Sequence, residues 1–164
     1  FGYPAMVNDK GIKKPSYYAY YFLSKLGDTL LYKGDGYILT KSEDEYQLLV
    51  YTYNDEIDSL IDFKNFTKLR GVKDLVDKKL SLNLLDLDSD VRITKYTIGE
   101  NFGSSFNYWL SMGKPKRLRK AEKDILFQAS YPKIEFKYAK KNTILNIQTT
   151  LQGYCAELFI LKKV

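Results

Sequence analysis

A helix with no polar face is predicted near the start of the chain, over residues 15–26. Pro15 suits a first helical position, where its missing N–H costs nothing, and Gly27 suits the position just past a helix end. A surface helix of a small protein has one apolar stripe, whereas the apolar side chains here surround the helix axis. They are Tyr17, Tyr18, Tyr20, Tyr21, Phe22, Leu23 and Leu26. We therefore expect this helix to be buried on more than one side.

The apolar period changes from helical to two after Gly27, which predicts strands from there on. Short helices are expected later, over 104–112 and over 116–129, and 54–79 reads as a long charged loop. A phase slip near Lys95 predicts a β-bulge. The expected strands are 29–32, 37–40, 46–53, 80–87, 91–98, 133–138, 143–151 and 155–162. Strands this short, with turns this frequent, predict a mainly β chain folded as an antiparallel β-sandwich.

Composition excludes several kinds of catalytic site. The chain has no histidine, which removes Ser-His and Cys-His catalysis and the usual zinc sites. Its single cysteine, Cys155, lies in an apolar run and is interpreted as a core residue. Asp86, Asp88 and Asp90 alternate like calcium ligands, but the glycine and closing glutamate of a calcium loop are absent. We expect no catalytic, cofactor-binding or metal-binding residues and no cofactor.

Residues 114–123, KPKRLRKAEK, form the densest basic run in a chain of net charge +6. One interpretation is a nucleic-acid patch. The other, which we favour, is the solvated face of a helix whose inner face holds Leu118, Ala121 and Ile125. Specific DNA reading needs an element that reaches base edges, and neither a recognition helix nor a stacking platform is evident. No sequence-specific DNA binding is expected.

The fifteen tyrosines and one tryptophan raise the alternative of a sugar-stacking surface. Most of them alternate with apolar neighbours, which favours core or interface use instead. Phe106, Trp109 and Met112 are spaced by three, so they share one helical face. We expect this face to be a structural anchor.

Four stretches of the sequence resemble the C-terminal region of glycoside hydrolase family 39, the β-xylosidase and iduronidase family. They are GIKKPSYYAYYFLSKLGDTLL (11–31), GYILTKSEDEYQLLVYTYN (36–54), GSSFNYWLSMGKP (103–115) and the closing AELFILKK (156–163). The resemblance covers nearly the whole chain and is vaguest over 55–79. Similar modules also occur fused to AraC-type helix-turn-helix domains in bacterial transcription regulators, and the 11–54 stretch looks more like those fusions.

The resemblance implies a division of the chain into two parts. Residues 1–27 would be the end of a (β/α)₈ barrel, with the helix as the last barrel helix, and residues 28–164 would be the C-terminal β-sandwich. The barrel is then the expected partner, and the expected barrel–sandwich interface consists of Tyr17, Tyr18, Tyr20, Tyr21 and Phe22. Because the family's two catalytic glutamates belong to earlier barrel strands, no residue here inherits their role.

Three function classes remain open at this point. The first is a non-catalytic accessory or structural domain of a regulator, which implies a cytoplasmic location, or of a family 39 β-xylosidase. The second is an independent carbohydrate-binding module, and the third is a free-standing DNA-binding domain. A saccharide is the ligand that the resemblance implies for the parent protein. No apolar run is long enough to span a bilayer, so no membrane contact is expected.

Overall fold

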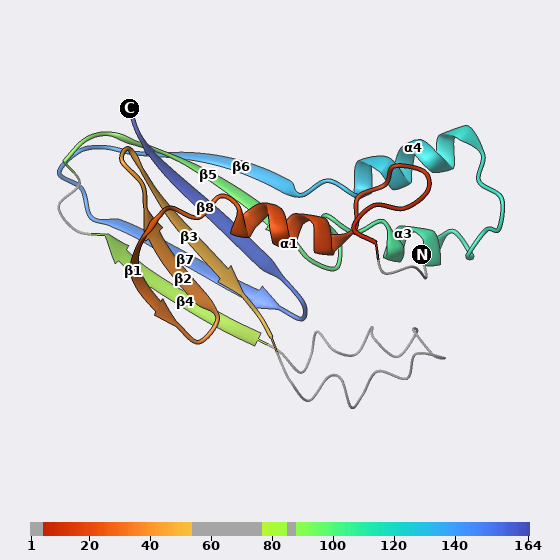
Figure 1. The fold of residues 1–164 in the computed structure, drawn as a ribbon, viewed down its shortest axis with the longest axis horizontal. Helices are drawn as coiled ribbons and strands as arrows, with labels where there is room; N and C mark the ends of the chain where they lie inside the picture. The colour runs from red at the N-terminus through yellow and green to blue at the C-terminus, as the bar shows by residue number, and fades with distance from the viewer. Residues whose placement is uncertain (1–4, 54–76, 85–87) are drawn as a thin grey trace.

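Two antiparallel sheets face each other in the computed structural model, which describes residues 5–53, 77–84 and 88–164 (Figure 1). The strands are β1 (Thr29–Gly34), β2 (Tyr37–Lys41), β3 (Glu45–Tyr51), β4 (Asp77–Leu84), β5 (Val91–Ile98), β6 (Lys133–Ala139), β7 (Leu145–Gln152) and β8 (Ala156–Lys163). Six of them form one sheet in the order β1-β2-β3-β8-β5-β6, and β4 pairs with β7 in a ribbon. The described helices are α1 (Pro15–Leu23), α3 (Phe106–Ser111) and α4 (Lys120–Ala129). The predicted mainly β, antiparallel fold is confirmed.

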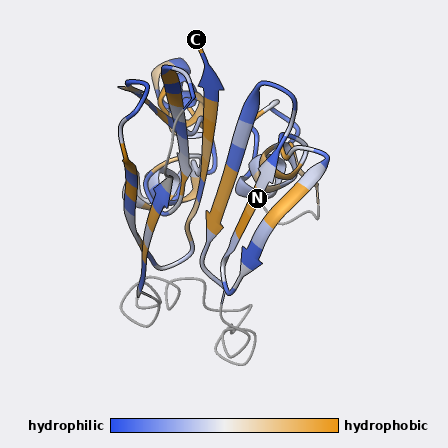
Figure 2. Cartoon of the chain, turned by 90° about the vertical axis from the view of Figure 1, so that its left-hand side faces the viewer, coloured by the Kyte–Doolittle hydropathy of each residue, from blue (hydrophilic) through white to orange (hydrophobic). Residues whose placement is uncertain are grey.

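The main hydrophobic core lies between the six-stranded sheet and the ribbon. Along β7, Ile147, Thr149 and Leu151 are buried while the residues between them are exposed. Apolar and polar residues alternate in this way along several strands (Figure 2). The buried core residues are Leu39, Leu48, Val50, Val91, Ile93, Ile147, Leu151, Phe159 and Leu161. Because successive residues of a strand point to opposite faces, these side chains lie on the faces that the two sheets turn toward each other. Packing there removes their apolar surface from water, which stabilises the fold.

The opposite face of the six-stranded sheet is covered in part by α1. Tyr18 and Phe22 of the helix pack with Leu49, Ile98 and Leu158 of the sheet in a second buried cluster. Phe22 and Leu158 have no exposed surface. The central strands are therefore covered on both faces, which explains why the residues predicted as the strand 46–53 are apolar on both sides.

Strand β5 contains no β-bulge near Lys95, so that prediction was wrong. Its register with β6 and β8 runs without a shift from Val91 to Thr97. Val91 and Ile93 face the ribbon, whereas Tyr96 and Ile98 belong to the cluster under α1. The apolar phase changes because a different face of the same regular strand is covered at each end.

The helices differ from their predicted extents and faces. Helix α1 ends at Leu23, three residues earlier than predicted, although Leu26 still packs against the cluster under α1. Helix α4 begins at Lys120 and buries Leu126, whereas Ile125 of the predicted inner face is 43% exposed. Strand β4 begins at Asp77, inside the stretch predicted as a loop. The rest of that loop lies outside the described residues.

Gly27 has a different role from the one that its position suggested. Its N–H donates to Thr40 Oγ1 at 2.8 Å and to Gln47 Oε1 at 3.1 Å. A Cβ at Gly27 would lie 2.5 Å from the backbone of Lys41. The glycine is therefore required by the close approach between the chain leaving α1 and strand β2, and not as the helix cap.

Candidate functional site

The outer face of α1 is the first candidate for an interaction surface. Its inner face, with Tyr18 and Phe22, is buried on the sheet, and Tyr17 and Tyr21 are half-buried at the flanks. Tyr20, on the outer face, is 61% exposed. The second outward apolar side chain is Leu23, at 48% exposure. The sandwich thus covers only part of a helix that is apolar all round, and the predicted barrel–sandwich interface stays a prediction.

An aromatic cluster with one buried, unpartnered hydroxyl lies along α1. Lys13 Nζ is 4.4 Å from the centre of the Tyr17 ring, and Tyr17 meets Tyr18 edge-to-face at 5.2 Å. The Tyr18 hydroxyl has no hydrogen-bond partner among the described residues. Burial raises its pKa to about 12, so the hydroxyl stays neutral. Because no described residue forms a hydrogen bond with it, no neighbouring group is placed to take its proton.

The predicted anchor on α3 comes together as one half-buried face. The rings of Phe106 and Trp109 are 5.9 Å apart, and Trp109 Nε1 donates to the Pro115 carbonyl at 3.2 Å. Met112 is half-buried as well. Phe106 and the Pro115 carbonyl thus hold the Trp109 ring in place, and the role of this face as an anchor stays a prediction.

We expect Trp109→Ala to destabilise the chain by about 2 kcal/mol. This is roughly half the cost of deleting a fully buried aromatic side chain, because Trp109 is only half-buried. Urea denaturation measures the loss, and Tyr108→Ala, an exposed neighbour on the same helix, is the control. An unchanged unfolding free energy together with lost binding to a xylo-oligosaccharide would support the platform interpretation instead.

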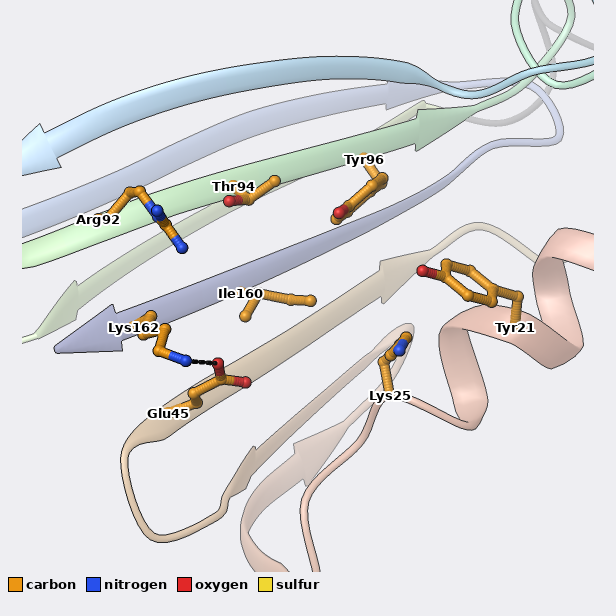
Figure 3. Close-up of a pocket in the computed structure, with 8 residues that line it drawn as sticks. All are labelled: Tyr21, Lys25, Glu45, Arg92, Thr94, Tyr96, Ile160 and Lys162. Atoms are coloured by element: carbon orange, nitrogen blue, oxygen red, sulfur yellow. Dashed lines mark ion pairs between the residues drawn. The ribbon is translucent and has the colours of Figure 1, made fainter.

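An open pocket of about 240 Å³ lies beside α1 on the six-stranded sheet (Figure 3). Its walls are Tyr21, Lys25, Glu45, Arg92, Thr94, Tyr96, Ile160 and Lys162. Glu45 is the single carboxylate among them, and it pairs with Lys162 Nζ at 3.4 Å. Glycoside hydrolysis normally needs two carboxyl groups flanking the bond. The pocket therefore offers no acid–base pair.

Glu157 is a buried carboxylate that the sequence analysis did not single out. It lies on β8 with its side chain 6% exposed, and Lys95 Nζ is 2.7 Å from Oε1. Thr149 of β7 donates to its other oxygen, and Thr97 of β5 donates weakly to Oε1. Glu157 thus joins the two sheets and has a structural role. A signal was present, because Glu157 shares its strand face with Phe159 and Leu161, both of which are buried.

The remaining candidates for chemistry have structural partners. Asp88 pairs with Lys163 at 2.6 Å, and this hydrogen bond lowers the pKa of the Asp88 carboxyl. Asp90 accepts from the Lys141 backbone N–H at 2.8 Å, and Asp86 lies outside the described residues. Within the described ranges, no group of three or more His, Cys, Asp or Glu side chains could hold a metal ion. Burial raises the pKa of the Cys155 thiol to about 12, which leaves it unreactive at neutral pH.

The basic run 114–123 lies on a loop followed by a helix start. Lys116, Arg117 and Arg119 precede α4, and only Lys120 and Lys123 are helical. All five are exposed. The prediction that one helix carries the whole run was therefore wrong. In the part of the chain that the structure describes, no helix is both long and apolar enough to cross a membrane.

Solved structures that share this fold include family 39 enzymes. The first is the GH39 enzyme from Xanthomonas axonopodis pv. citri, with a TM-score of 0.77 and 16% identity over 98% of this chain and 32% of that chain. The second is a monomeric β-xylosidase from Caulobacter crescentus CB15, with a TM-score of 0.75 and 17% identity over 98% and 33%. At these identities the match shows the fold, and the chain spans about a third of each enzyme.

Related curated sequences are bacterial regulators, whereas no family model matches. An uncharacterized HTH-type transcriptional regulator of Staphylococcus aureus strain N315 is 25% identical over 129 residues, which are 75% of this chain and 16% of the regulator. The version from strain MRSA252 is 24% identical over 128 residues. The chain spans about a sixth of the length of these regulators. The expected resemblance is thus confirmed: the chain has a fold found within glycoside hydrolase family 39 enzymes and a sequence similar to part of HTH-type transcriptional regulators.

Proposed function

We propose that this chain is the non-catalytic C-terminal β-sandwich of a family 39-like module within an AraC-type transcriptional regulator. The fold of the family 39 enzymes and the sequence similarity to HTH-type regulators support this assignment. The observation that carries the structural role is α1, which is apolar all round and covered on one side by the sheet. Its domain boundary then falls after Gly27, with residues 1–27 belonging to the barrel.

The proposed role is to dock onto a barrel and stabilise it. Phe22 and Tyr18 fix α1 to the sandwich, which leaves Tyr20 and Leu23 as the apolar contacts offered to the barrel. Burying these two side chains would remove apolar surface from water, which is favourable at about 25 cal/mol per Å². The helix would then be a shared element of the two domains.

The test compares the isolated chain with the longer protein that contains the barrel. The variant Tyr20→Ala with Leu23→Ala should leave the melting temperature of the isolated chain unchanged and lower that of the longer protein. Tyr32→Ala is the matched control, since Tyr32 is 68% exposed on β1, away from α1. If the double variant and the control melt alike in the longer protein, α1 does not dock the barrel.

A family 39 β-xylosidase is the second candidate parent, because the solved structures with this fold include β-xylosidases. Both parents leave this fragment without chemistry of its own. The sequence before Phe1 distinguishes them: an HTH domain indicates a regulator, and a barrel with both glutamates indicates an enzyme.

The isolated chain is expected to show no glycosidase activity. A retaining glycosidase needs two carboxyl groups about 5 Å apart at the scissile bond, and the pocket beside α1 supplies only Glu45. Release of nitrophenol from an aryl xyloside measures this, with Glu45→Gln as the control. Activity that Glu45→Gln or Glu157→Gln abolishes would contradict the proposal.

Recognition of other molecules is assigned to the rest of the parent. DNA reading would belong to the helix-turn-helix domain, and the run 114–123 would contribute only salt-sensitive attraction to phosphates. A saccharide ligand would bind the barrel. A regulator parent places the chain in the cytoplasm.

A further inference from the structure

Strand β6 forms one edge of the six-stranded sheet in the described part of the chain. It pairs with β5 on one side, and no described strand pairs with its other side. Three apolar side chains on one face of this edge are exposed: Ile134 by 49%, Phe136 by 65% and Tyr138 by 75%. An exposed edge with large apolar side chains is a template for another strand.

We propose that two copies of this chain pair antiparallel through β6, with Phe136 of each copy on the twofold axis. The result is one continuous sheet across the dimer. This goes beyond the proposed docking of α1 and does not depend on it.

The sequence of β6 is self-complementary in this register. Phe136 is the central residue of Lys133–Ala139, so pairing around it matches all seven residues of the strand. Phe136 then faces its own copy, and Ile134 faces Tyr138 twice. Aromatic and β-branched pairs opposite each other stabilise antiparallel strands.

The charges on the other face match in the same register. Glu135 of each copy lies opposite Lys137 of the other copy. Among the described residues, the one ion-pair partner of Glu135 is the exposed Lys133, at 3.1 Å, and Lys137 has none. Pairing around Glu135 instead would oppose Glu135 to itself and Lys133 to Lys137, which is unfavourable.

In the dimer, the exposed apolar side chains of β6 would form one row that runs across both copies. Ile134, Phe136 and Tyr138 stand opposite Tyr96, Thr94 and Arg92 of β5, so they lie on the α1 side of the sheet. In this register, residues opposite each other point to the same side of the sheet, so the α1 face of both copies lies on one side. The twofold axis is therefore perpendicular to the sheet. The two exposed rows then shield each other from water at the junction.

Charge swapping tests the register by analytical ultracentrifugation of the purified chain. The wild type should dimerise reversibly. Glu135→Lys alone places a lysine opposite Lys137 at both of these positions in the dimer, and Lys137→Glu alone places a carboxylate opposite Glu135 at both. Each single variant should therefore weaken the dimer about tenfold. The double variant restores both pairs and should recover the dimer. A chain that is monomeric throughout, or a double variant no better than the single ones, overturns the proposal.

A cysteine at the axis gives a second readout, which reports the register of the paired strands. In a Cys155→Ala background, Phe136→Cys places two thiols opposite each other, where mild oxidation should link the copies. Tyr138→Cys is the control on the same face, because its two copies would be about 13 Å apart along the strands, beyond the roughly 7 Å limit for a disulfide. Equal cross-linking of both variants, or none at residue 136, overturns the proposed register.

Discussion

Phe22→Ala is expected to destabilise the chain by about 4 kcal/mol, the largest effect of any α1 substitution. Phe22 has no exposed surface and lies 6.2 Å from the Tyr96 ring, in the cluster that joins the helix to the sheet. Deleting a buried aromatic side chain removes its transfer free energy and leaves a cavity. In a domain of this size the melting temperature should fall by roughly 10 °C or more.

The matched control is Tyr20→Ala on the same helix. Tyr20 is 61% exposed, so its removal should change the unfolding free energy by less than about 0.5 kcal/mol. Urea denaturation followed by tryptophan fluorescence compares the two variants. Equal effects of Phe22→Ala and Tyr20→Ala would show that α1 is not fixed to the sheet through its inner face.

Lys95→Met is expected to cost about 3 kcal/mol, since removing one member of a buried pair leaves the other charge uncompensated. Lys95 is 2.7 Å from Glu157, and their side chains are 24% and 6% exposed. The Thr149 and Thr97 hydroxyls would still reach the carboxylate but cannot neutralise it. Denaturant unfolding measures the loss.

A double variant separates the charge from the packing. Lys95→Met with Glu157→Met replaces the whole pair by apolar side chains, and such replacements are often neutral or stabilising. We therefore expect the double variant to be more stable than Lys95→Met alone. Lys133→Met is the surface control, because its pair with Glu135 is exposed on both sides and should contribute little. If the double variant loses as much as the single one, the ion pair is not what joins the sheets.

The fold was largely predictable because its strands have period two and its turns are short. Strand β5 was predicted with its observed bounds, and the KKN turn before β7 contains Asn142 at a φ of 60°. The change of covered face along β5 was not predictable, since it depends on where α1 lies. A local pattern reports which positions are apolar and says nothing of what covers them.

The candidate site was predicted less completely, for the same reason. The five aromatics of α1 were chosen as one barrel–sandwich interface; Phe22 is buried on the sheet and Tyr20 is exposed, and the barrel contact stays a prediction. Glu157 was passed over because the alternate face of β8 was taken as the inner one, whereas both faces of that strand are covered. Gly27 was interpreted as a helix cap because a local sequence pattern does not show contacts between elements. Its close approach to Lys41 is such a contact.

The position of β8 has a consequence for synthesis on the ribosome. This strand lies between β3 and β5 and contributes to both hydrophobic clusters, yet it comes after all the other described strands in the sequence. Glu45 pairs with Lys162 in register, so the sheet cannot close around its centre until the chain through Lys162 has emerged. Until then β3 and β5 have open edges, which are prone to wrong pairing. A nascent chain stalled before Ala156 should therefore be sensitive to protease, and extending it through β8 should make it resistant in one step.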